Sequence, residues 1–355
     1  MRKANRSLVF IVPGRLETRT GGYEYDRRMV AGLRARDWSV DVRELDGSCP
    51  HPTSGALNHA AGVLAAIPDR TTVLVDGLAL GAMPAELECE SSRLRIVALI
   101  HLPLAAEIGI GQDVAARLEA SERRAVAAAA LVIVTGKSTL SVLAKYGVPS
   151  HQIALVEPGT DRAPLARGSQ EGPCQLLCVA TLNPGKGHET LVRALAAVPH
   201  GDWHLTCAGS LDRHPPTMQR LREQVRAAGL EARISLVGDL NAAALAACYD
   251  NADLFVLATL HETYGMAVAE ALAHGLPVVS TATGAIPELV GDEAGLLVPA
   301  GDTAALTATL SQVLGDRHLR ARLAEGARRV RDRLPTWEEA VGKMADALER
   351  GATDG

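Results

Sequence analysis

Residues 253–281 read DLFVLATLHETYGMAVAEALAHGLPVVST, and their pattern decides the fold class. The apolar run 253–259 is followed by apolar residues at helical spacing from Met266 to Leu276. A second apolar run, 276–281, comes directly after Gly275. A strand, a helix and a strand in immediate succession predict a crossover between parallel strands of an α/β sheet.

The same alternation continues along the chain and predicts two doubly wound, Rossmann-like domains. The predicted strands are 8–14, 39–45, 71–77, 94–101, 130–136 and 153–159 in the first domain, and 174–181, 203–209, 233–238, 253–259, 276–281 and 295–300 in the second. We place the domains at 1–165 and 166–335, with a polar linker at 160–173 and a final helix in 336–355 that packs back on the first domain. Two such domains are expected to face each other across a cleft that binds ligands.

The composition excludes several classes of protein. The 36 Lys and Arg residues against 41 Asp and Glu give a net charge of -5, and only 3% of the residues are aromatic. A nucleic-acid partner is therefore not expected. No apolar stretch approaches the roughly 20 residues that span a bilayer, which predicts a cytoplasmic protein. The six cysteines are scattered, which favours buried thiols over disulfides or a zinc site.

Motifs for common cofactors are missing from the sequence. There is no GxGxxG after a strand and no GxxxxGK[ST], so nicotinamide and P-loop sites are not expected. There is also no Asp-x-Asp pair to hold a divalent ion against a diphosphate. The sequence predicts no metal and no cofactor.

Two glutamates eight positions apart, Glu262 and Glu270, flank the start of the helix in the opening segment. Eight helical residues rise about 12 Å, which exceeds the roughly 5 Å of a retaining glycosidase pair and suits the two ends of an extended ligand. The amides of Tyr264, Gly265 and Met266 lie at a helix N-terminus, which favours an anion between the carboxylates. This pattern indicates a nucleotide-sugar. An ordinary amphipathic helix with an N-terminal glutamate is the alternative.

The segment resembles the E-x7-E signature of the retaining glycosyltransferases of family 4, which have the GT-B fold. The likeness continues through TATGAIPELV at 281–290 and covers essentially the whole chain. It implies that Glu262 contacts the donor sugar, that Glu270 contacts the ribose, and that the backbone of Tyr264, Gly265 and Met266 contacts the diphosphate. The first domain would bind the acceptor and the second the donor.

Further residues of the second domain receive roles from the same resemblance. Lys186, in VATLNPGKGH at 179–188, would neutralise the leaving diphosphate. The family usually carries an Arg at the position of Thr181, so a second positive charge would have to come from elsewhere. Thr283 and Gly284 would lie beside the nucleotide and sugar.

The resemblance also assigns roles at the nucleobase and in the first domain. The backbone of Val237 and Gly238 would read the base, with uridine the default and guanosine or adenosine open. His101, at the end of a predicted strand, would contact and position the donor sugar. Gly21 and Gly22, in a loop after the first strand, would approach donor phosphate or acceptor, and the polar residues 23–27 would start a helix that reads the acceptor.

These expectations define a metal-independent retaining glycosyltransferase that transfers a hexose from a nucleotide-sugar, by default UDP-linked. A small-molecule acceptor is favoured over a lipid, because the arginine-rich segment 317–333 is typical of a solvated helix; contact with anionic lipid is the alternative. A sugar-nucleotide-binding partner protein without transferase activity also remains open, on the ground of Thr181. The sequence does not define the sugar, the acceptor or the oligomeric state.

Overall fold

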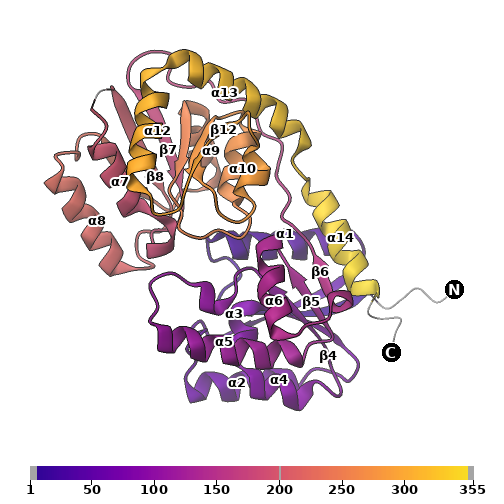
Figure 1. Cartoon of the computed structure of the whole chain (residues 1–355). Coiled ribbons are helices and arrows are strands. Elements are labelled where there is room, and N and C mark those ends of the chain that lie inside the picture. Colours follow the sequence, from indigo (N-terminus) through magenta and orange to yellow (C-terminus); the bar gives the residue numbers. More distant parts are fainter. Residues whose placement is uncertain (1–5, 200, 351–355) are drawn as a thin grey trace. The chain divides into compact units, whose positions relative to one another are not determined.

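A computed structural model describes residues 6–199 and 201–350 of the chain (Figure 1). The chain divides into two compact units, Met1–Gly159 with Thr336–Gly355 and Thr160–Pro335. The chain passes from one unit to the other at Gly159, a few residues before the boundary expected from the sequence, and returns at Thr336. Each unit is described by itself below.

The first unit is built around a six-stranded parallel sheet with the order β2-β1-β3-β4-β5-β6. Its strands are β1 (Ser7–Pro13), β2 (Ser39–Leu45), β3 (Thr72–Asp76), β4 (Arg95–Ile100), β5 (Leu131–Val134) and β6 (Ile153–Leu155). Its helices are α1 (Gly21–Ala35), α2 (Ser54–Ala65), α3 (Gly77–Ala82), α4 (Pro84–Glu90), η1 (Leu104–Ala106), α5 (Gln112–Ala127), η2 (Lys137–Thr139), α6 (Leu140–Tyr146), η3 (Ser150–Gln152) and α14 (Trp337–Arg350).

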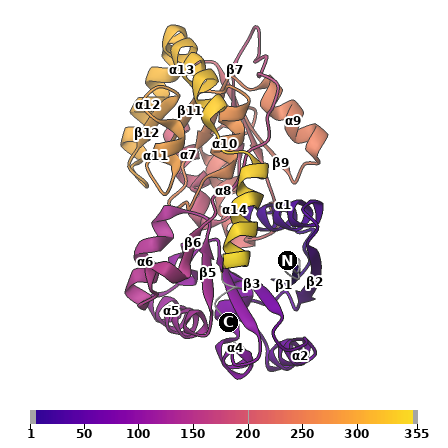
Figure 2. The ribbon, with the colours of Figure 1, turned by 90° about the vertical axis from the view of Figure 1, so that its right-hand side faces the viewer.

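Helices cover both faces of this sheet, which explains why β1 is apolar at successive positions rather than at alternate ones. Phe10 points into a cluster with Met29 of α1 and Met344 of α14. Its neighbour Ile11 points to the opposite face, into a cluster with Leu64 of α2. The two helices of the first cluster, α1 and α14, lie beside the same face of the sheet (Figure 2). The C-terminal helix therefore completes the core of the first unit.

The second unit repeats the architecture with a six-stranded parallel sheet in the order β12-β11-β10-β7-β8-β9. Its strands are β7 (Cys174–Val179), β8 (Trp203–Ala208), β9 (Ile234–Gly238), β10 (Leu254–Leu257), β11 (Val278–Thr281) and β12 (Gly295–Val298). Its helices are η4 (Pro184–Lys186), α7 (His188–Ala196), α8 (Pro215–Ala227), α9 (Ala242–Asn251), α10 (Met266–Ala273), α11 (Ile286–Val290), α12 (Thr303–Gly315), α13 (Arg317–Val330) and η5 (Arg331–Arg333).

Each predicted strand is present, and most are shorter than the apolar run that indicated them. The run 153–159, for example, pairs only over Ile153–Leu155 before the chain leaves the sheet. The helix expected from Met266 ends at Ala273, before the turn at Gly275. Over residues 6–199 and 201–350, no helix combines the length and apolarity needed to cross a membrane.

The arginine-rich segment 317–333 forms α13 and η5, with an apolar face packed inside the second unit. Leu319, Leu323 and Ala327 are buried. Several of the arginines have protein partners: Arg329 and Arg333 both pair with Glu293. These contacts agree with a solvated, ion-paired helix face.

The strand orders define the topological switch point of each sheet, where successive connections begin to run to opposite sides of one strand. In the first sheet β2 lies on one side of β1 and β3 on the other; in the second, β8 and β10 lie on the two sides of β7. Ligands of open α/β sheets bind outside the carboxyl ends of the strands at such points. The loops after β1 and β3, and those after β7 and β10, are therefore where functional side chains are expected.

Candidate functional site

The loops after β7, β10 and β11 are joined by hydrogen bonds at the switch point of the second sheet. The Leu260 amide donates to the Gly185 carbonyl at 2.7 Å, and the Thr259 hydroxyl donates to the same oxygen at 3.1 Å. The Thr281 hydroxyl donates to the Thr259 carbonyl at 2.6 Å. The turn before Lys186 and the segment before Glu262 are thus held to each other by backbone geometry.

Lys186 and Glu262 form an ion pair across this junction. The Lys186 Nζ lies 2.6 Å from the Glu262 Oε2, and the side chains are 28% and 16% exposed. Lys186 ends η4, where the side chain of Asn183 accepts its backbone N–H. Gly187, which follows, has φ +68°, and a Cβ there would lie 1.8 Å from the Ala258 carbonyl oxygen. The turn is therefore locked against the end of β10.

The N-terminus of α10 begins directly after this ion pair. Gly265 is its N-cap in the left-handed conformation, with φ +99°. The first N–H groups of any helix have no partner within the helix, so those following Gly265 are available to an anion. Tyr264 is buried, whereas Met266 is half-buried. Residues 264–266 therefore lie at the start of α10, and their contact with a diphosphate stays a prediction.

Gly284 brings the loop after β11 against the same segment. A Cβ at Gly284 would lie 1.9 Å from the Glu262 carbonyl oxygen, and the residue has φ +54°. The Ala285 amide donates to the Thr263 carbonyl at 3.2 Å. The neighbouring Thr283 is half-buried, and its Oγ1 has no hydrogen-bond partner among the described residues. Thr283 and Gly284 therefore belong to the same cluster of loops as Glu262.

Glu270 lies just over one turn into α10 and is held by a residue that sequence reasoning missed. The hydroxyl of Tyr249, in α9, donates to the Glu270 Oε2 at 2.9 Å. Tyr249 is 2% exposed, and its ring stacks on His274 with centroids 4.7 Å apart. A single aromatic residue in the alanine-rich stretch AAALAACYDN was the available signal. The carboxylate is therefore fixed in direction by a buried phenol.

Three further predicted residues of the second unit lie at or just after the carboxyl ends of β7 and β9. Thr181 follows β7 and is half-buried, and the backbone there packs on Gly209, whose Cβ would lie 2.2 Å from the Ala180 carbonyl oxygen. Val237 and Gly238 end the edge strand β9, two strands away from β7, and Val237 is 42% exposed. No contact joins these residues to the Lys186–Glu262 pair in the hydrogen bonds and ion pairs of the described chain.

The first unit brings His101 together with two buried aspartates. The His101 Nε2 lies 3.0 Å from the Asp26 Oδ1 and 3.4 Å from the Asp76 Oδ2. Asp26 comes from α1, Asp76 ends β3, and His101 follows β4. Sequence reasoning grouped Asp26 with the polar start of the first helix and did not single out Asp76. An acid at the carboxyl end of the run TTVLVDG was the signal for Asp76.

The glycine pair lies in the first turn of α1 rather than in the loop expected from the sequence. Gly21 and Gly22 begin the helix after the N-cap Thr20. A Cβ at Gly22 would lie 3.3 Å from the His101 Cδ2. Gly22 therefore allows the helix backbone to approach the His101 ring closely.

Burial and mutual charge interactions shift the pKa values of Asp76 and His101. Burial and the charge of Asp26 together raise the pKa of Asp76 to about 7, although His101 and two backbone N–H groups act in the opposite direction. Burial acts to lower the pKa of His101, but its interactions with Asp26 and Asp76 outweigh that effect and raise the pKa above its usual value. The cluster therefore holds protons near neutral pH.

Two groups of side chains within the described residues are close enough to hold a metal ion, Asp26–Asp76–His101 and Cys178–His188–Cys207. In the second group the cysteines pair in register on β7 and β8, and His188 Nε2 lies 3.8 Å from the Cys178 Sγ. His188 is buried, and its Nδ1 has no hydrogen-bond partner among the described residues. A metal-ligating histidine normally donates its other N–H to a partner, so the cysteine group fits buried thiols better than a metal.

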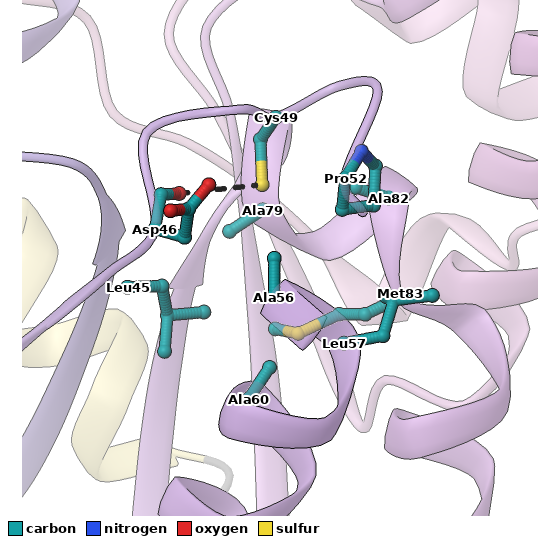
Figure 3. Close-up of a pocket in the computed structure, with 10 residues that line it drawn as sticks. All are labelled: Leu45, Asp46, Cys49, Pro52, Ala56, Leu57, Ala60, Ala79, Ala82 and Met83. Carbon is teal, nitrogen blue, oxygen red and sulfur yellow. Dashed lines mark hydrogen bonds between the residues drawn. The ribbon is translucent and has the colours of Figure 1, made fainter. Parts of the chain in front are cut away.

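A small pocket in the first unit is lined mostly by apolar side chains from the end of β2, α2 and α3 (Figure 3). Cys49 Sγ lies there, 4.0 Å from the Asp46 carbonyl oxygen. Burial, together with the charges of Asp76 and Asp46, raises the pKa of the Cys49 thiol to about 11. The sequence-predicted site residues are not among those that line this pocket.

Comparison with known proteins identifies the family of the second unit. Residues 161–330 match the family model described as "Glycosyl transferases group 1". The second unit belongs to the group 1 glycosyl transferases. The group 1 match spans the elements that carry Lys186, Glu262 and Glu270.

Similar curated proteins are bacterial glycosyltransferases. A D-inositol 3-phosphate glycosyltransferase of Xylanimonas cellulosilytica is 29% identical, over 65% of this chain and 59% of the relative. Another, of Salinispora arenicola, is 32% identical over 65% and 57%. An MMP alpha-(1->4)-mannosyltransferase of Mycolicibacterium hassiacum is 25% identical over 88% and 79%. The chain thus spans less than two thirds of the two inositol-phosphate relatives.

Solved structures share the fold of the whole chain. Sucrose-phosphate synthase of Thermosynechococcus elongatus matches with a TM-score of 0.83 at 21% identity, over 98% of this chain and 100% of that one. Anabaena HepE in complex with UDP and glucose matches with a TM-score of 0.78 at 18% identity, over 97% and 99%. The GT-B fold expected from the sequence is confirmed, and the expected glycosyltransferase family is confirmed for residues 161–330.

Proposed function

We propose that this protein is a metal-independent retaining glycosyltransferase that moves a hexose from a UDP-sugar to a hydroxyl of a small-molecule acceptor in the cytoplasm. The observation that carries the proposal is the cluster at the β7–β10 switch point. There a Lys186–Glu262 ion pair 2.6 Å long directly precedes the N-terminus of α10. A cation, a helix N-terminus and a carboxylate at one place suit a diphosphate linked to a sugar.

In this proposal the protein stabilises the leaving group and contributes no nucleophile. Lys186 and the first amides of α10 offset the negative charge that develops on the departing diphosphate. Glu262 accepts hydrogen bonds from sugar hydroxyls, and Glu270, oriented by Tyr249, accepts them from the ribose diol. The diphosphate takes the acceptor proton on the face from which it leaves, so the configuration at the anomeric carbon is retained. His101, from the first unit, positions the donor sugar.

The comparisons support this choice of donor and acceptor. A structural neighbour, Anabaena HepE, has been solved with UDP-glucose, which favours uridine over guanosine or adenosine. The D-inositol 3-phosphate glycosyltransferases among the relatives act on a small phosphorylated polyol. We therefore propose an acceptor of this kind in preference to a lipid, without contact with a membrane surface.

The proposal is tested with the purified full chain after treatment with EDTA. Thermal shift is measured with UDP-, GDP- and ADP-glucose and with the corresponding mannose and N-acetylglucosamine donors. The donor that stabilises the protein is then incubated with D-inositol 3-phosphate and other small polyols, and the products are analysed by mass spectrometry and by NMR of the anomeric proton. We expect stabilisation by a UDP-sugar and an α-linked product from an α-linked donor.

Other results separate the alternatives. Stabilisation without transfer or donor hydrolysis would favour a sugar-nucleotide-binding partner protein, which the Thr181 substitution of the usual Arg also suggests. Loss of transfer after EDTA treatment, restored by a divalent ion, would contradict metal independence. A β-linked product would contradict retention, and no stabilisation by any sugar nucleotide would overturn the site assignment.

A further inference from the structure

The ring of His101 meets two carboxylates at a single nitrogen. The Nε2 lies 3.0 Å from the Asp26 Oδ1 and 3.4 Å from the Asp76 Oδ2. Asp26 is 1% exposed and Asp76 is 5% exposed, while the His101 side chain is 20% exposed. The two acids that face Nε2 are therefore buried, whereas the His101 side chain keeps some exposure to solvent.

This arrangement determines which nitrogen carries a proton. Carboxylates accept hydrogen bonds, so the Nε2 facing them carries its hydrogen in both the neutral and the charged ring. The second proton of the charged ring then resides on Nδ1. Two acids at 3.0 and 3.4 Å in a buried setting favour that second proton, because an opposite charge nearby stabilises the charged form.

His101 is the main source of positive charge opposite the two buried aspartates. The Asp26 Oδ2 is buried without a hydrogen-bond partner among the described residues. Asp76 accepts the Leu78 amide at 2.9 Å. Leaving a buried carboxylate without a counter-charge is costly, so a neutral His101 would leave this cluster poorly compensated.

Among residues 6–199 and 201–350, the other groups that contact His101 or its aspartates carry no opposing charge at neutral pH. From α1, Tyr25 contacts the ring edge-on with centroids 5.1 Å apart and donates its hydroxyl to the Val156 carbonyl. From the end of β5, the Thr135 hydroxyl donates to the His101 carbonyl at 3.4 Å. From the loop after β2, the Cys49 thiol is close enough to interact with Asp76 and stays protonated because burial raises its pKa.

We infer that Asp26 and Asp76 are positioning residues that hold His101 as an imidazolium, with Nδ1–H as a hydrogen-bond donor toward a substrate oxygen. In this protonation state His101 cannot act as a general base, since neither nitrogen of an imidazolium has a lone pair to accept a proton. The identity of that oxygen, on the donor sugar or its phosphate, rests on the proposed function. The protonation state of His101 is independent of the proposed function, because it follows from the two aspartates.

The test is an NMR titration of the ligand-free full chain, observed through the imidazole carbon and nitrogen resonances. His101→Gln assigns the His101 signal, and the exposed His151 provides a comparison in the same spectra. We expect His101 to titrate above the ordinary histidine pKa of about 6.5, with Nε2 protonated throughout. Asp26→Asn, which keeps the shape of the side chain, should lower that pKa by at least about one unit.

Asp76→Asn provides a second variant with the same expected direction, in case Asp26→Asn impairs folding. Asp41→Asn is the matched control in the same unit, because Asp41 is exposed on β2 and pairs with Arg43 instead of His101. A His101 pKa at or below 6.5, or one that neither asparagine variant changes, overturns the inference. So does selective broadening of the His101 signal by micromolar Mn²⁺, which would make the cluster a cation site.

Activity is measured separately, so that the two proposals fail independently. If the titration behaves as expected and no donor is ever turned over, the proposed function fails and the role of the aspartates stands. If transfer is observed, Asp26→Asn should reduce kcat more at pH 8 than at pH 6, while Asp41→Asn leaves both values unchanged. An Asp26→Asn defect of equal size at both pH values would indicate a structural role only and would contradict the inference.

Discussion

At the scale of single residues, the ion pair between Lys186 and Glu262 has a consequence for binding. In the free protein the positive charge of Lys186 is directed at a carboxylate 2.6 Å away. A diphosphate that reaches Lys186 must share it with Glu262, so binding changes the partners of both side chains. The pair also keeps an otherwise uncompensated carboxylate from opposing an anionic ligand.

Replacing Lys186 by Ala should reduce kcat by about 10²–10³-fold, the usual effect of removing one donor that stabilises developing charge. Lys186→Arg keeps the charge and should retain part of the turnover. Steady-state kinetics with the stabilising donor provide the measurement, with the exposed Lys145→Ala as the control. Full turnover in Lys186→Ala would remove Lys186 from the proposed mechanism.

Glu270→Ala should weaken nucleotide binding rather than turnover at saturating donor. A hydrogen bond to a charged group contributes about 1.5–3 kcal/mol, so the Kd for UDP measured by calorimetry should rise about tenfold to a hundredfold. Tyr249→Phe removes the hydroxyl that orients this carboxylate and should raise the Kd by a smaller factor. An unchanged Kd in both variants would show that Glu270 does not contact the nucleotide.

At the scale of elements, the loops after β7, β10 and β11 act as one unit because glycines let their backbones touch. At Gly284 a Cβ would lie 1.9 Å from the Glu262 carbonyl oxygen. Gly284→Ala should therefore displace the segment that carries Glu262 and reduce transfer sharply. Gly229→Ala is a matched control, since Gly229 also has a positive φ but has nothing within 4 Å of an added Cβ. Equal activity in the two variants would contradict close packing at Gly284.

A buried acid links two elements of the first unit and predicts a pH dependence. Glu122 of α5 accepts the Leu104 amide at 3.1 Å and the Tyr146 hydroxyl at 2.8 Å. Burial raises the pKa of Glu122 to about 7, although both hydrogen bonds act in the opposite direction. In the folded state the Glu122 carboxyl thus keeps its proton at pH values at which the same carboxyl is ionised in the unfolded chain.

Glu122 should therefore contribute stability below about pH 4.5 that is lost as the pH rises through about 7. Glu122→Gln should remove this pH dependence. Relative to the wild type, its free energy of unfolding should therefore rise by on the order of 3 kcal/mol between pH 5 and 8. Denaturant unfolding of both proteins at several pH values measures the difference. Parallel pH profiles would show that Glu122 ionises normally.

At the scale of the whole molecule, two separately packed units are joined by a chain that crosses between them twice. The core of the first unit depends on α14, which lies at the far end of the sequence. Met344→Ala should destabilise the first unit by about 2–5 kcal/mol, because Met344 is 0% exposed in that core. Hydrogen exchange should show reduced protection in β1 to β6 and unchanged protection in β7 to β12.

Lys343→Ala is the control for Met344→Ala, since the neighbouring side chain is exposed on the same helix. Equal loss of protection in both sheets would show that the units unfold as one. Such a result would also mean that the effects of single-unit substitutions on stability cannot be separated.

Much of the fold was predictable because its signals are local. The twelve apolar runs, the helix after Gly265 and the final helix from Trp337 are read from neighbouring residues. The glutamate spacing and the lysine turn were recognisable for the same reason, since each motif is a few residues long. The extent of pairing was less predictable: the run 153–159 joins the sheet only over Ile153–Leu155, because β5 determines where its hydrogen bonds end.

The sequence by itself determined the α/β class, the two-fold repetition of the architecture and the motifs of a glycosyltransferase. Only the tertiary structure decided which motif residues meet. It placed Lys186 against Glu262, 76 positions away, Tyr249 against Glu270, and two aspartates against His101. Periodicity depends on neighbours along the chain, whereas strand order depends on which faces bury the most apolar surface, so contacts at the ends of parallel strands follow from packing.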